Sequence, residues 1–207
     1  MKLAFITKKE VDFFIQDAIN FVNKNFDSKV FYSDWNSSID QNLYNDDIDI
    51  VVSYLSRWIL PKEILNNTKF CAINFHPAPP NYRGYGPYSF ALYNNESAYG
   101  VTCHHMNEKL DNGSIIDVSR FNIYKTDTVE TLIQRSYSYQ LQLFYKVFDL
   151  ILTENKIPIS NEKWSDNKYT KKELDKLMIL NKSMSSEEIE RRNRALAFKN
   201  WKPFYGD

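Results

Sequence analysis

The chain has 207 residues, which is enough for one full α/β core and a small appended piece. Lysine plus arginine and aspartate plus glutamate both total 26, so no broad basic field favours nonspecific nucleic-acid binding. The apolar run within residues 1–9 is too short for a signal peptide or a membrane span. Cys71 and Cys103 are isolated in apolar segments, which indicates reduced, buried thiols. We therefore expect a cytoplasmic protein without a membrane segment.

The first third of the chain alternates strand-like and helix-like segments. Strands are expected at residues 2–7, 30–32, 47–54 and 70–75. Apolar residues at helical spacing predict a helix over residues 9–24, and Pro61 opens a second, shorter helix. This alternation predicts an α/β fold with a mostly parallel, doubly wound (Rossmann-like) sheet and helices on both faces.

The pattern changes after the strand at 70–75. Residues 79–87 contain three prolines and two glycines, so they are expected to form a loop. A short helix over residues 88–94 and strands over 100–106 and 114–123 should follow. Asp127 and Glu130 have the spacing of a capping box, which predicts a long helix to about residue 153.

The tail from about residue 158 is richer in charge and poorer in β-branched residues. Two pairs in it have capping-box spacing, Thr170 with Glu173 and Ser185 with Glu188. We therefore expect a main domain over residues 1–155 and a short helical C-terminal extension over residues 156–207 that packs on it.

Residues with unusual chemistry are concentrated between about residues 74 and 113. This window holds all three histidines, four of the five glycines and four of the seven prolines. Groups that titrate near neutral pH and special backbone shapes therefore occur together, and the functional site is expected there.

The strand that ends with Asn74-Phe75-His76 carries polar groups to the carboxyl end of a parallel sheet, where doubly wound folds bind ligands. Asn74 and His76 face the same way because strand side chains alternate. Asp111 lies in a tight turn before Gly113, from which its side chain can project. If Asp111 meets His76, the three residues supply a base, its orienting carboxylate and a hydrogen-bond donor. Acyl transfer to an amine requires these groups.

Other interpretations remain open at this point. Asn74 could cap the proline-rich turn, His76 could be a hydrogen-bonded turn residue, and Asp111 could form an Asx turn. A metal site with His76, His104 and Asp111 as ligands is a further alternative, although it leaves Asn74 and the Tyr-Arg-Gly loop without a purpose.

Two motifs resemble those of the folate-dependent formyltransferases. Residues 74–84 resemble the N-x-H-P…Y-R-G signature of that family, and residues 100–116 resemble its second block, G-V-T-x-H…D-x-G-x-I-I. The resemblance covers roughly residues 1–125. It implies that residues 1–155 are a formyltransferase catalytic domain that uses 10-formyltetrahydrofolate as co-substrate and needs no metal.

The resemblance also implies roles for individual residues. Asn74 would bind the formyl oxygen and stabilise the charge that develops on it. His76 would act as an acid–base group or as an electrostatic partner, with Asp111 orienting it and His104 in support. The folate pocket is implied at Trp58, Ile59, Leu60, Met106 and Leu110.

Departures from the family pattern narrow the acceptor. The Gly-rich first turn of glycinamide ribonucleotide formyltransferases is missing. The tail is too short for the tRNA-binding domain of initiator-tRNA formyltransferases, and the regulatory domain of formyltetrahydrofolate hydrolases is not expected. What remains resembles the sugar N-formyltransferases. They formylate a nucleotide-linked amino sugar, such as a dTDP-4-amino-4,6-dideoxyhexose, for surface polysaccharide such as the O-antigen of lipopolysaccharide.

The expected partners are therefore this nucleotide-amino-sugar and the folate, with no nucleic acid and no membrane. The residues expected to bind the acceptor are Lys8, Tyr82, Arg83, Gly84, Tyr85, Tyr88 and Trp201. Trp201 can stack on a base, pack on the main domain or lie in a homodimer interface. The alternatives are a formyltetrahydrofolate hydrolase, a formyltransferase for another small amine, and a non-catalytic ligand-binding module.

Overall fold

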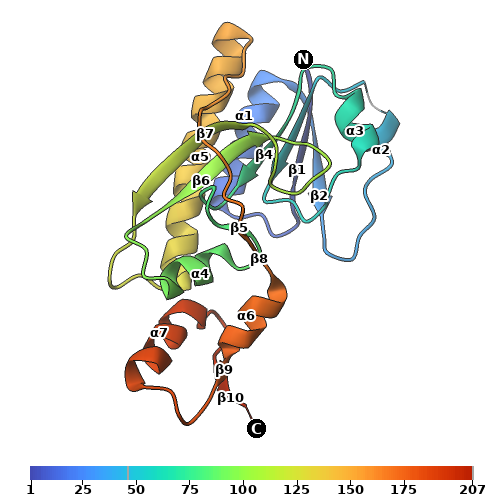
Figure 1. Cartoon of the computed structure of the whole chain (residues 1–207). Coiled ribbons are helices and arrows are strands. Elements are labelled where there is room, and N and C mark those ends of the chain that lie inside the picture. Colours follow the sequence, from blue (N-terminus) through green and yellow to red (C-terminus); the bar gives the residue numbers. More distant parts are fainter. Residues whose placement is uncertain (46, 207) are drawn as a thin grey trace.

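The protein is described by a computed structural model that covers residues 1–45 and 47–206. Its centre is a six-stranded sheet in the order β2-β1-β3-β4-β6-β7 (Figure 1). The strands are β1 (Lys2–Lys8), β2 (Asp27–Ser33), β3 (Ile50–Tyr54), β4 (Cys71–His76), β6 (Ala98–His105) and β7 (Ile115–Asn122). β2, β1, β3 and β4 are parallel, whereas β6 is antiparallel to β4 and to β7. The expected mostly parallel sheet is confirmed.

Helices cover both faces of this sheet. The elements on one face are α1 (Phe13–Asn25) and α5 (Val129–Glu154), and those on the other are α2 (Asn42–Asn45) and α3 (Lys62–Asn67). Alternate residues of β1 enter the two layers, because strand side chains point to opposite faces. Leu3 and Phe5 belong to the core beneath α1 and α5, whereas Ala4 and Ile6 belong to the core beneath α2 and α3.

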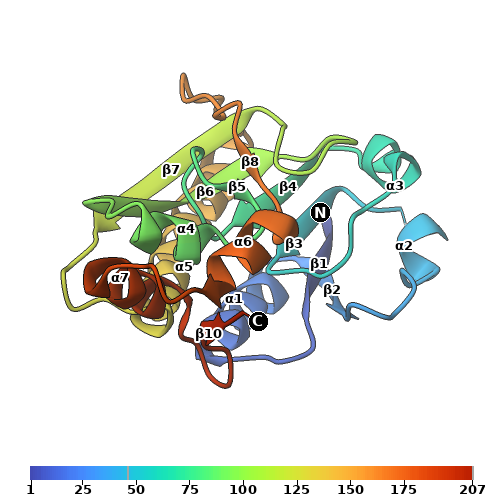
Figure 2. The ribbon, with the colours of Figure 1, turned by 60° about the horizontal axis from the view of Figure 1, so that its bottom comes forward.

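A third apolar cluster joins α4 (Pro87–Tyr93) to the C-terminal extension. The extension contains α6 (Lys171–Met178), β9 (Ile179–Leu180), α7 (Ser186–Leu196) and β10 (Phe204–Tyr205). Figure 2 shows α7 beside α4, and the two helices are in contact. Ala195 and Leu196 of α7 are buried in the same cluster as Phe90 of α4. Within the described part of the chain, no helix is long and apolar enough to cross a membrane.

Helix ends follow the expected signals in part. The capping box of Thr170 and Glu173 is present, and the Ser185 side chain accepts from the backbone N–H of Glu188. The expected start of α5 was wrong by one residue, because Thr128 is its N-cap. Asp127 instead forms an ion pair with Arg135, at 2.7 Å.

Two further expectations need correction. α1 begins at Phe13 and not at residue 9, because β1 continues to Lys8 and the Asp12 side chain caps the helix. The segment 79–87 is not wholly a loop, since β5 (Arg83–Gly84) pairs in parallel with β8 (Lys168–Tyr169) of the extension. A pairing of two residues with a partner about 85 positions away leaves no local pattern that could reveal it.

Candidate active site

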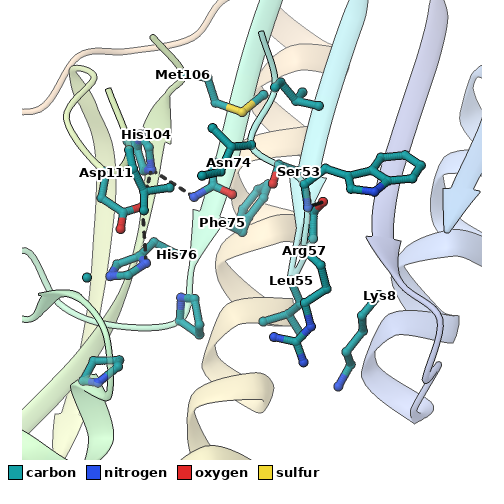
Figure 3. A pocket seen from close by; sticks show the side chains of 18 of the residues that line it. Lys8, Ser53, Leu55, Arg57, Asn74, Phe75, His76, His104, Met106 and Asp111 are labelled. Atoms are coloured by element: carbon teal, nitrogen blue, oxygen red, sulfur yellow. Dashed lines mark hydrogen bonds and ion pairs between the residues drawn. The ribbon is translucent and has the colours of Figure 1, made fainter. Parts of the chain in front are cut away.

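A cavity of about 310 Å³ opens at the carboxyl ends of β1, β3 and β4, the end of a parallel sheet where ligands bind. Lys8, Ser53 and Asn74, each near the end of one of these strands, all line it. Figure 3 shows Asn74, His76, His104 and Asp111 gathered on one side of the cavity, with Lys8 and Arg57 on the other.

The three residues expected to carry the chemistry lie together. Asp111 Oδ1 is 3.6 Å from Nδ1 of His76 and 3.7 Å from Nε2 of His104. These distances are too long for hydrogen bonds, so the carboxylate acts on both rings through its charge. The side chains of His76, His104 and Asp111 are buried, with exposed fractions of 9%, 3% and 6%. The charge of the Asp111 carboxylate is therefore weakly screened.

Asn74 reaches the same group through His104. The two residues are register partners on β4 and β6, and the Asn74 amide nitrogen is 3.0 Å from Nε2 of His104. Nδ1 of His104 lies 2.8 Å from the carbonyl oxygen of His105, which can only accept, so Nδ1 carries a proton. Nε2 then accepts one N–H of Asn74 and fixes the carboxamide. The second N–H of Asn74 stays free for a ligand oxygen.

The loop that carries Asp111 presses closely on β6. Asp111 itself has a left-handed backbone with φ of 49°, and Gly113 has no room for a side chain. A Cβ on Gly113 would collide with the carbonyl oxygen of His105. Glycine at this position therefore lets the loop approach the strand and brings the Asp111 carboxylate to the imidazoles.

Electrostatics divides the proton-carrying roles between His76 and Asp111. Burial lowers the pKa of His76 below its usual 6.5, and the opposing charge of Asp111 does not reverse that effect. Burial alone would raise the pKa of Asp111, but His76, His104 and the backbone N–H of Gly84 lower it to about 2. At neutral pH the carboxylate is therefore ionised and the His76 imidazole is neutral, with a nitrogen lone pair that can accept a proton.

The protonated nitrogen of His76 can be assigned from its partner. Nε2 lies 3.3 Å from the backbone carbonyl oxygen of Tyr82, which can only accept, so Nε2 is the nitrogen that carries the proton. Nδ1, which faces Asp111, is then the basic nitrogen. A proton accepted there would lie beside the carboxylate, which stabilises the imidazolium.

All five side chains expected to border the folate line the cavity: Trp58, Ile59, Leu60, Met106 and Leu110. The Trp58 indole N–H donates to the carbonyl oxygen of Ser37 at 3.0 Å, which fixes the ring. Leu55 and Leu65 add to this apolar wall. An apolar slot that ends at a few polar groups fits a flat heteroaromatic ligand such as a pterin.

Only some of the residues expected to bind the acceptor line the cavity. Lys8, Gly84 and Tyr88 line the cavity, whereas Tyr82, Arg83, Tyr85 and Trp201 lie outside it. Tyr85 is 45% exposed, and Trp201 is 64% exposed in a separate hollow of the extension next to Phe204.

Tyr82 and Arg83 instead hold the loops of the site. The buried Tyr82 hydroxyl donates to Glu96 at 2.7 Å. Arg83 donates to the carbonyl oxygen of Ser165 at 2.9 Å and to Asn112 Oδ1 at 3.1 Å. It thereby links the loop after β4 both to the loop that carries Asp111 and to the C-terminal extension.

The metal alternative requires at least three ligand side chains around one point. Within residues 1–45 and 47–206, no group of three or more His, Cys, Asp or Glu side chains is arranged to hold a metal ion.

Comparisons with known proteins point to one family. A sequence model described as formyl transferase matches residues 15–148. A methionyl-tRNA formyltransferase from Ehrlichia ruminantium is 34% identical over 154 residues, which cover 73% of this chain and 48% of that protein. A GDP-perosamine N-formyltransferase from Brucella melitensis is 27% identical over 160 residues, which cover 77% of this chain and 61% of that protein. The chain thus spans about half to three fifths of the length of these relatives.

Among solved structures, a 4-N formyltransferase from Francisella tularensis has the same fold, with a TM-score of 0.79. It is 24% identical to this chain, and the alignment covers 98% of this chain and 90% of that one.

Proposed function

The chain belongs to the formyl transferase family, and on that premise we propose that it transfers a formyl group from 10-formyltetrahydrofolate to the amine of a nucleotide-linked amino sugar. One observation carries the proposal. Asn74, His76 and Asp111, from two segments about 35 residues apart, meet beside a cavity that also has an apolar wall.

Each of these residues has a distinct task. The free N–H of Asn74 donates to the formyl oxygen and stabilises the negative charge that develops on it during attack. The neutral His76 takes the proton that the attacking amine loses, and Asp111 stabilises the resulting imidazolium. His104 holds the Asn74 carboxamide in position. The net reaction moves the formyl group from the folate nitrogen to the acceptor nitrogen and a proton in the opposite direction.

The folate supplies the reactive formyl group, and the wall of Trp58, Leu60 and Met106 would hold its ring system. The hydrogen bond from Trp58 to Ser37 would hold the indole in place against that ring system. Contact between this apolar wall and the ligand would exclude water from the reacting carbon and so disfavour hydrolysis.

Two kinds of observation bear on the identity of the acceptor, the names of the relatives and the charged residues of this chain. The relatives' names point to two acceptors, methionyl-tRNA and GDP-perosamine. The equal counts of 26 acidic and 26 basic residues give no broad field for tRNA. Lys8 and Arg57 provide cationic groups at the cavity, which suits a small anionic acceptor such as a nucleotide sugar. We therefore favour the amino-sugar acceptor and a place in O-antigen synthesis.

Substitution of Asn74 tests the proposal. Asn74→Ala should lower kcat by roughly 10²–10³-fold and change KM little, because the lost hydrogen bond strengthens only as charge develops. Asn74→Asp keeps the shape without a donor and should lose as much. The measurement is formyl transfer from 10-formyltetrahydrofolate to a panel of nucleotide-amino-sugars.

Three outcomes would count against this function. Near-wild-type turnover of the Asn74 variants would remove the residue from the mechanism. Formate release at full rate without any amine would identify a hydrolase. Binding of a nucleotide sugar without turnover, whatever the folate concentration, would identify a non-catalytic binding module.

A further inference from the structure

Behind the imidazole pair lies a tryptophan that comes from the C-terminal extension. Trp164 belongs to the segment 156–170, which we call the strap; Figure 1 shows it in orange, running from α5 to β8. The Trp164 ring meets His104 edge-on at 5.0 Å between centroids and His76 at 5.9 Å. Trp164 does not line the cavity, so the indole contacts the imidazoles without contacting the ligand space.

Trp164 also fixes the loop that carries Asp111. Its indole N–H donates to the carbonyl oxygen of Gly113 at 2.7 Å. Gly113 is the residue whose close approach to β6 sets the position of Asp111. One side chain therefore contacts both imidazoles and tethers the carboxylate loop.

The strap is itself attached on both sides of the site. The backbone N–H of Ser165 donates to the carbonyl oxygen of Pro80 at 3.1 Å, in the loop after β4. The N–H of Ser160 donates to the carbonyl oxygen of Ile115 at 2.8 Å, at the start of β7. The Arg83 guanidinium lies 5.7 Å from the Trp164 ring. Trp164 is thus held between the loop after β4 and the loop that carries Asp111.

We propose that Trp164 is a positioning residue for formyl transfer, which shields the His76–His104 pair from water and holds the Asp111 loop in register with it. The inference rests on the proposed function and extends it, because it makes the C-terminal extension part of the active site. The family motifs at residues 74–84 and 100–116 do not include this residue.

The shielding has a consequence for titration. Burial is the largest influence on His76 and lowers its pKa, while Asp111 raises the pKa, and His104 and Arg83 lower it. The carbonyl oxygen of Tyr82 is the remaining partner. Removal of the indole would admit water beside the ring and weaken the effect of burial. The pKa of His76 would then rise towards 6.5. The acid limb of the pH profile of kcat, where kcat falls as the pH decreases, would move to higher pH.

Two variants separate the shield from the tether. Trp164→Ala removes both, and kcat should fall by roughly 10–100-fold, since a displacement near 1 Å has effects of that order. KM for both substrates should change less than about threefold, because Trp164 lies outside the cavity. Trp164→Phe keeps an apolar ring but lacks the N–H. It should leave the acid limb in place and lower kcat by a smaller factor.

The control lies in the same strap. Glu162 forms an ion pair with Arg120 of β7, with oxygen–nitrogen distances of 2.6 and 2.9 Å, and does not approach the imidazoles. Glu162→Gln loosens the strap at its surface and should leave kcat and its pH dependence unchanged. kcat is measured with both substrates saturating, so that ionisation of the free amine does not enter.

NMR titration of the imidazole C–H signals reads the pKa of His76 without turnover, and the chain has only three histidines. An Ala variant that is folded and keeps the wild-type kcat and the wild-type His76 titration overturns the inference. If that variant does not fold, wild-type kcat in Trp164→Phe overturns it. Absence of formyl transfer in the wild type would refute the proposed function, whereas the His76 titration would still decide whether Trp164 shields the ring.

Discussion

His76 is subject to two opposing influences. A carboxylate at 3.6 Å favours its protonated form, whereas burial favours the neutral form, and burial prevails. A base that is neutral at pH 7 yet lies beside a fixed negative charge can accept a proton and be stabilised once it has done so. His76 can therefore accept a proton at neutral pH, and Asp111 then stabilises the imidazolium.

Replacement of Asp111 by asparagine isolates this charge. Asp111 has a left-handed backbone, which asparagine tolerates, so Asp111→Asn changes the charge with little strain. Asp111 raises the pKa of His76, so its loss should lower that pKa and move the acid limb of kcat to lower pH. The plateau should fall by roughly 10²-fold or more, because the imidazolium loses its partner. The direction of the shift is opposite to that expected for Trp164→Ala.

The same substitution at the surface provides the comparison. Asp175 pairs with Lys171 on α6 and is 51% exposed. Asp175→Asn should therefore leave the pH profile unchanged. A plateau at the wild-type level in Asp111→Asn would show that the carboxylate does not support proton transfer.

At the scale of elements, the sequence predicts what short-range patterns encode. The strands, α5 and the position of Asn74 and His76 at the end of β4 follow from apolar periodicity and from motif order. The pairing of β5 with β8 and the place of Trp164 behind His104 depend on contacts between residues about 60–85 positions apart. No local signal marks Trp164, and for the same reason Arg83 was expected to bind substrate and not to join two loops.

The start of α5 offers a direct test of the corrected cap. Asp127 is 3% exposed, accepts from the backbone N–H of Tyr124 at 2.7 Å and pairs with Arg135. Asp127→Ala should lower the free energy of unfolding by about 2–4 kcal/mol, because a buried network loses its acceptor. Glu130→Ala should change that energy by less than about 0.5 kcal/mol, because Glu130 is exposed and is not part of the cap.

Chemical denaturation of both variants gives the two energies. Equal losses would mean that Glu130 contributes to the cap after all. Gln140 of α5 donates to the carbonyl oxygen of Phe75 in β4 at 3.2 Å. Loosening of this helix would therefore weaken the support of the strand that carries Asn74 and His76.

At the scale of the whole molecule, the extension shares a core with the main domain. Met178, Ala195 and Leu196 are buried in one cluster with Phe90 and Leu132. The expected boundary near residue 155 coincides with the end of α5, where Asn155 adopts a left-handed conformation. We therefore propose one cooperative unit in which the extension completes both the third apolar cluster and the site.

A chain ending at Asn155 should consequently fail to fold cooperatively. It would lack Met178, Leu180 and Leu196, whose exposure is 8% or less. Loss of each such side chain lowers the free energy of unfolding by about 2–5 kcal/mol. The sum reaches the total free energy of unfolding of a typical domain, about 5–15 kcal/mol. We expect no sharp transition in calorimetry. The aromatic residues that a chain ending at Lys199 lacks, such as Trp201 and Phe204, are exposed, so this chain should keep the sharp unfolding transition. A sharp transition and formyl transfer in the shorter chain would make the extension dispensable, because the site would then form without the strap.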